Sequence, residues 1–135
     1  MPPISRVSFL AFALLLSACG GGGDSFADTV LLKTGQAKTT DAGQLTLTMT
    51  KFVDSRCPRA VTCITPGAAV IDVTLAQQGA APATVQMTLS GAAGTQAPVT
   101  TYGPYRIEFT DIQPYPNSPV LTITDSEATL VVRRD

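Results

Sequence analysis

Short runs in which apolar and polar residues alternate recur along the chain from residue 29 onward. In the clearest run, residues 44–50, leucine or methionine occupies every second position and threonine the positions between them. A period of two is that of a β-strand with one buried face, because successive side chains of a strand point to opposite sides of the sheet. The runs span residues 29–33, 44–50, 69–76, 84–89, 105–110, 120–124 and 128–133.

No segment shows the period of an amphipathic helix, and turn motifs such as Pro66-Gly67 separate the runs at intervals typical of sandwiches and barrels. With strands of ordinary length, the chain has room for about seven to eight of them. We therefore predict an all-β fold, a single antiparallel β-sandwich. A small β-barrel is the alternative, because alternation alone does not distinguish two open sheets from one closed sheet.

Two places interrupt the alternation. Phe52 is apolar at a position in register with the threonines of residues 44–50, which predicts a β-bulge or a bend at residues 51–53. Residues 114–119 contain three prolines, which have no N–H group to donate to a neighbouring strand. This segment is predicted to run extended on the surface.

The N-terminal segment has the pattern of a secretory signal peptide. Arg6 precedes an apolar stretch of ten residues, 7–16. A transmembrane helix needs about 20 apolar residues, so this stretch is too short to span a membrane. We predict that residues 1–18 are removed during export.

Leu16-Ser17-Ala18-Cys19 resembles the lipobox of bacterial lipoproteins, in which cleavage occurs before a cysteine that carries the lipid. The resemblance implies lipidation of Cys19 and attachment to a membrane of the cell envelope. Gly20 in place of an aspartate implies the outer membrane, facing the periplasm, if the organism has two membranes. A plain secreted protein with an incidental Cys19 is the alternative.

The predicted domain organisation follows from this N-terminus. The glycine run 20–23 cannot pack a core and is typical of a flexible tether. We assign residues 1–18 to the signal peptide, residues 19–27 to the lipidated cysteine and tether, and residues 28–135 to the β-sandwich.

Charge argues against nucleic acid as a partner. Without Arg6 the chain keeps 8 of its 9 basic residues beside 10 acidic ones, a formal net charge of −2. The sequence contains no basic stripe and no alternation of basic with aromatic residues, which proteins that bind nucleic acid or anionic lipid use. The predicted attachment to the membrane is therefore covalent.

With Cys19 assigned to lipid, Cys57 and Cys63 remain as a pair. An exported protein meets an oxidising compartment, which favours a structural disulfide between them. The alternative is a thiol-disulfide redox site, since Arg56 and Arg59 would favour a thiolate at Cys57, but the spacing is not Cys-x-x-Cys.

The sequence lacks histidine, which removes the Ser-His-Asp and Cys-His arrangements and the commonest zinc ligand. We predict no catalytic residue, no metal site and no cofactor, and hence no enzyme.

Asp54, Arg56, Arg59 and Tyr115 are the candidate binding residues. In one interpretation, Asp54 accepts backbone N–H groups in a turn and Arg56 pairs with it. In the other, Arg56 and Arg59 project from the disulfide-closed loop and grip an acidic ligand. Tyr115 would line a binding surface or cover an end of the sandwich.

The segment Asp54-Ser55-Arg56-Cys57-Pro58, followed by Cys63 and a glycine-led strand at 67–73, resembles a group of small bacterial lipoproteins. A second matching stretch covers residues 105–109, Ile112 and Pro114-Tyr115-Pro116. Relatives often carry a tryptophan two residues after the second cysteine, where this chain has Thr65. The resemblance implies an envelope location and a β fold, without a particular activity.

Together these features predict a lipid-anchored, non-catalytic envelope module. It would bind another envelope component or a small ligand through the Cys57–Cys63 loop and the Tyr115 segment. The alternatives are a thiol-disulfide redox protein and a purely structural surface lipoprotein. The sequence contains no feature that sets an oligomeric state.

Overall fold

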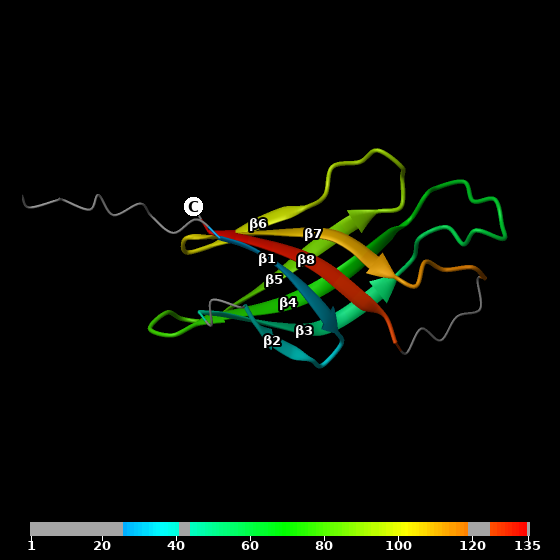
Figure 1. Ribbon diagram of the computed structural model, residues 1–135. Helices are drawn as coiled ribbons and strands as arrows, with labels where there is room; N and C mark the ends of the chain where they lie inside the picture. The colour runs from blue at the N-terminus through cyan, green and yellow to red at the C-terminus, as the bar shows by residue number, and fades with distance from the viewer. Residues whose placement is uncertain (1–25, 41–43, 119–124, 135) are drawn as a thin grey trace, which may run out of the picture.

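A computed structural model of the protein describes residues 26–40, 44–118 and 125–134. These residues form two four-stranded antiparallel sheets that face each other as a sandwich (Figure 1). The first sheet has the order β1 (Phe26–Lys33), β8 (Glu127–Arg134), β7 (Tyr105–Gln113), β6 (Val99–Tyr102). The second has the order β2 (Ala37–Thr39), β3 (Leu45–Asp54), β4 (Ala68–Gln77), β5 (Ala83–Ser90).

The structure confirms the predicted all-β sandwich, and the barrel alternative is wrong because the two sheets do not join into a closed one. The strands β2 and β6 were not predicted. They have only three and four residues, too few for a pattern of alternation to stand out. The predicted strand at 120–124 lies outside the described residues.

The core lies between the sheets and is built from the apolar positions of the alternating runs. Leu45, Leu47 and Met49 of β3 are fully buried, as the alternation predicts. Their counterparts on the other strands complete the core: Val30, Leu32, Ala69, Ile71, Val73, Leu75, Met87, Tyr105, Ile107, Phe109, Ile112, Ala128, Leu130 and Val132.

The predicted irregularity near Phe52 is a β-bulge. Met49 pairs with Val73 and Lys51 with Asp72, so that Thr50 is the extra residue. The extra residue shifts the alternation by one position and returns Phe52 to the inner face, where it packs against the core.

Strand β1 begins at Phe26, two residues before the expected start of the domain. Phe26 pairs with Arg134 of β8, and its ring meets that of Tyr105 edge to face at 6.2 Å between centroids. Burial of this aromatic contact stabilises the start of β1, so the strand begins before the alternating run of residues 29–33.

The sandwich has two distinct ends. At one, which we call the terminal end, the Gln44 side chain accepts hydrogen bonds from the hydroxyl of Tyr105 (3.2 Å) and from Arg134 Nη1 (2.7 Å), close to Phe26. At the other, the clip end, lie the segments 55–67 and 114–118 (Figure 1). The eight residues of β1 separate the two ends by about 25 Å, at ~3.3 Å per residue.

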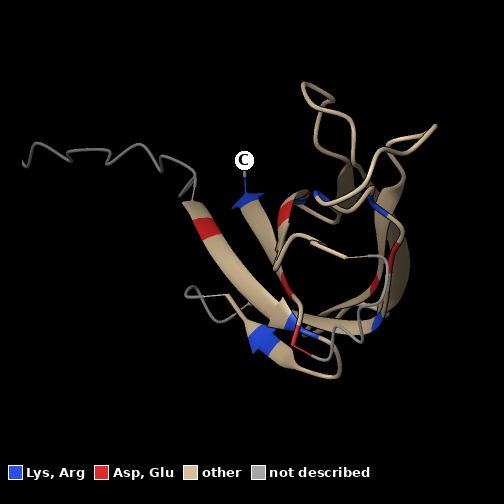
Figure 2. Cartoon of the chain, turned by 90° about the vertical axis from the view of Figure 1, so that its right-hand side faces the viewer, with Lys and Arg blue, Asp and Glu red and all other residues tan. Residues whose placement is uncertain are grey.

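Charged residues are spread over the strands of both sheets rather than gathered on one (Figure 2). No helix in the described ranges is long and apolar enough to cross a membrane.

Candidate functional site

The clip end is built on the hairpin of β3 and β4. Beyond the last paired residues of these strands, Ser55 N donates to Ala68 O (2.8 Å) and Cys57 N donates to Pro66 O (2.9 Å). The two arms of the loop therefore stay paired as far as Cys57. We call residues 55–67 the clip loop.

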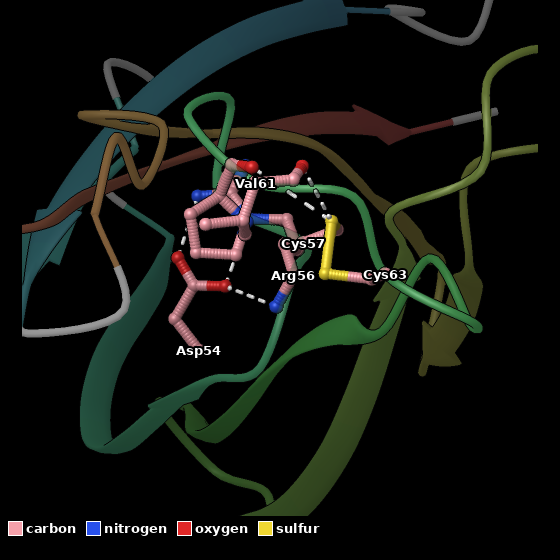
Figure 3. The surroundings of a disulfide bond; sticks show 6 residues. Asp54, Arg56, Cys57, Val61 and Cys63 are labelled. Carbon is pink, nitrogen blue, oxygen red and sulfur yellow. Dashed lines mark hydrogen bonds and ion pairs between the residues drawn. A yellow bond between two sulfur atoms is a disulfide. The ribbon is translucent and has the colours of Figure 1, made fainter.

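The predicted disulfide between Cys57 and Cys63 is present, with the two Cα atoms 5.8 Å apart (Figure 3). Cys57 is half-buried and Cys63 is exposed, as are all residues from Arg59 to Pro66. Cys57 Sγ lies 3.7 Å from the carbonyl oxygens of Pro58 and Val61. These are contacts rather than hydrogen bonds, because a disulfide sulfur carries no proton.

Replacing both Cys57 and Cys63 with serine is expected to lower the free energy of unfolding by about 2 kcal/mol, the loop-closure entropy of so short a loop. The sheets should persist, because the paired base of the clip loop does not depend on the bridge. Urea unfolding of both proteins, with and without dithiothreitol, measures the effect. The reductant should destabilise the parent alone, and equal stability of parent and variant would contradict a structural bridge.

Asp54 and Arg56 form a buried ion pair at the base of the clip loop (Figure 3). Arg56 Nε and Nη2 donate to the two carboxylate oxygens of Asp54 at 2.9 and 2.7 Å, and the backbone N–H of Arg56 donates to the same carboxylate at 3.0 Å. Their side chains are only 3% and 4% exposed. Of the two interpretations of these residues, the local pair is the one that the structure contains, and Arg56 does not project toward solvent.

Tyr115 joins the second segment of the clip end to this base. The guanidinium carbons of Arg56 and Arg59 lie 4.5 and 4.9 Å from the centre of its ring, within range of cation–π attraction. Arg56 Nη2 also donates to Pro114 O (3.4 Å). Arg59 is exposed, and within the described part of the chain no ion pair links it to a carboxylate.

Backbone hydrogen bonds reinforce that junction. The N–H groups of Arg59 and Ala60 donate to the carbonyl oxygens of Pro116 (3.0 Å) and Asn117 (3.2 Å). The clip loop is thus tied down by the disulfide, by the hairpin and by residues 114–117. All four candidate binding residues meet here, although Tyr115 lies about 60 residues from the other three in the sequence.

Two glycines allow the loop to pass so close to its neighbours. Gly67 has φ +68°, and a Cβ atom there would lie 1.8 Å from the carbonyl oxygen of Ser55. A Cβ atom on Gly91 would lie 2.3 Å from the carbonyl oxygen of Pro66. The sequence shows Gly67 as part of a turn, but nothing in it predicts these approaches.

A groove that the sequence does not predict runs along β1, where the open edges of the two sheets meet. Asp28, Thr29, Val30 and Leu31 of β1 line it together with Lys38 and Thr39 of β2, around a volume of about 260 Å³. It is open to solvent and lies apart from the clip loop, so it brings no further group to the candidate site.

The clip end exposes Arg59, part of the Tyr115 ring and the aliphatic and threonine side chains of residues 60–66. Such groups can bind a partner through charge and apolar contact. In the described ranges, no three histidine, cysteine, aspartate or glutamate residues stand close enough together to hold a metal ion.

Comparison with known proteins adds no relative: no protein-family model, no curated protein and no solved structure matches the chain.

Proposed function

We propose that this protein is a non-catalytic module of the bacterial cell envelope that is attached to a membrane through a lipid on Cys19. It binds another envelope component, or a small ligand, through its clip end. The observation that carries the proposal is the rigid construction of the clip loop at the end of the sandwich opposite Phe26.

The positions of the terminal end and the clip end support a role in which the protein presents the clip loop to a binding partner. A lipidated Cys19 would be connected through residues 20–25 to Phe26, at the terminal end. The clip loop lies about 25 Å from there, the length of one β1 strand. A protein held by its N-terminus would therefore offer the clip loop away from its own membrane.

The bracing of the loop supports binding over a purely structural role. A surface spacer needs no fixed loop, whereas a binding loop gains affinity when it is ordered before the partner arrives. Here a disulfide, an ion pair and two backbone hydrogen bonds to the 114–117 segment order it.

The proposal predicts a crosslinking pattern in cells that produce the full-length chain. A photoreactive amino acid at Ala60, which is exposed in the clip loop, should give one discrete adduct. The same probe at Gln78, exposed at the terminal end, should give none. In a Cys19→Ser background the adduct at residue 60 should weaken, because the protein is no longer held at the membrane.

Adducts of equal yield at residues 60 and 78 would indicate random encounters and contradict a binding clip end. If neither position yields an adduct, the interaction with an envelope protein is refuted, and the purely structural role gains support. An adduct that Cys19→Ser does not alter, in a protein that fractionates with the soluble proteins in both forms, would refute the lipid anchor.

A further inference from the structure

The outer part of the clip loop is uncharged and apolar. Five large hydrophobic residues in the described ranges are substantially exposed: Leu31, Val53, Val61, Ile64 and Val99. Val61 (43% exposed) and Ile64 (104%) both lie in the clip loop, within four positions of each other. Residues 60–67 of this loop carry no charge.

A single exposed aliphatic residue on a protein surface needs no explanation. Ile64 differs in where it is held. It follows Cys63 directly, so the disulfide fixes the backbone beside it, and the hydrogen bonds of Arg59 and Ala60 fix the other arm of the loop. The disulfide and these hydrogen bonds thus hold an apolar tip in water, where its exposure does not stabilise the fold.

We infer that Val61 and Ile64 form a hydrophobic anchor that inserts into an apolar pocket of a partner protein, with Arg59 facing a carboxylate at the rim of that pocket. The inference rests on the proposed function and names the partner class. An exposed aliphatic side chain on a fixed backbone can fill an apolar pocket of a partner, and arginine is enriched among the residues that dominate interface affinity. Arg59 is available for such a pair because no carboxylate of the described residues occupies it.

A protein fits the tip better than a bilayer. Peripheral membrane binding draws on clusters of basic residues and on aromatic side chains at the interface. Residues 59–66 offer one arginine and no aromatic residue, and Tyr115 at the base of the loop is half-buried with its ring against the guanidinium groups of Arg56 and Arg59. The tip also lies at the end of the sandwich opposite Phe26, which under the proposed function is the end away from the anchoring membrane.

The test uses a photoreactive amino acid at Thr62, which is exposed between the two anchor residues, in cells that produce the full-length chain. In the parent background we expect one protein adduct. Adding Ile64→Ser should reduce its yield about tenfold or more, since burial of one aliphatic side chain is worth about that factor in affinity. Arg59→Glu should reduce it similarly by placing an acid opposite the carboxylate of the rim. Leu31→Ser, an equally simple truncation of an exposed apolar residue outside the clip loop, should leave it unchanged.

Thermal unfolding of the purified variants shows whether a lost adduct results from a destabilised protein. Because Ile64 is fully exposed, Ile64→Ser should unfold at the parent temperature. If the adduct survives Ile64→Ser while the probe at residue 60 still crosslinks, the anchor is refuted and the proposed function stands. An adduct of twice the mass of the chain would mean self-association, and a lipid adduct would mean membrane insertion; either overturns the inference. Absence of adducts at both 60 and 62 overturns the inference together with the binding of an envelope protein.

Discussion

Replacing Arg56 with methionine is expected to lower the free energy of unfolding by about 3–5 kcal/mol, the usual cost of breaking a buried ion pair from one side. The Asp54 carboxylate, 4% exposed, would keep only the backbone N–H of Arg56 as a hydrogen-bond partner among those described above. The variant also loses the contact with the Tyr115 ring and the hydrogen bond to Pro114 O. For a domain of this size the midpoint of thermal unfolding should fall by roughly 10–20 °C.

A matched control exists on the surface of the first sheet. Arg133 Nη1 lies 3.1 Å from Glu108 Oε2, but these side chains are 48% and 25% exposed. Arg133→Met should therefore cost about 1 kcal/mol or less. Comparable losses for the two arginines would contradict the view that burial decides the importance of the Asp54–Arg56 pair.

The double variant Asp54→Leu with Arg56→Met separates two effects: the cost of leaving the Asp54 carboxylate unpaired and the cost of losing the other contacts of Arg56. It leaves no buried charge, so much of the stability lost in Arg56→Met should return. If the double variant is instead less stable than Arg56→Met, the important contacts are those of Arg56 with the 114–117 segment, and the carboxylate is secondary.

The fold could be predicted largely from the sequence because the strands of a sandwich share one pattern, the alternation of apolar residues on the buried face with polar residues on the other face. From Leu45 to Met49 every second residue of β3 is apolar, and burial follows that pattern residue by residue. The sequence also indicated the β-bulge, since the apolar Phe52 falls on the side of the threonines. In the structure, Thr50 is the extra residue of that bulge. The short strands β2 and β6 were not predicted because three or four residues are too few to show a period of two.

The candidate site was predictable in its parts and not in its geometry. Cysteine spacing indicated the bridge, and the short separation of Asp54 and Arg56 suggested a local pair. Contact of Tyr115 with both arginines depends on where the far ends of β3 and β7 lie across the sandwich, which no local pattern contains. The exposure of Ile64 is equally a tertiary property, because the neighbouring residues in the sequence do not determine whether another part of the chain covers it.

Gly67→Ala is expected to cost roughly 2–5 kcal/mol, although it adds a single methyl group. Two penalties combine at this position. The residue adopts φ +68°, a left-handed conformation that costs about 1–2 kcal/mol for an L-residue with a side chain. The new Cβ atom would also lie 1.8 Å from Ser55 O and 3.0 Å from Arg56 Cα, both of them backbone atoms. Overpacking of that kind costs about 1–3 kcal/mol more.

Gly79→Ala isolates the first penalty, because Gly79 has φ +80° and a Cβ atom there would meet nothing within 4 Å. The difference between the two variants in urea unfolding measures the close approach alone. Ser55 can only yield by drawing Arg56 away from Asp54 or by opening the paired base of the clip loop. Gly67→Ala should therefore also weaken the crosslink at residue 60, whereas Gly79→Ala should not. Equal losses of stability in the two variants would mean that the clip loop moves aside freely, and the rigid presentation on which the proposed function depends would be wrong.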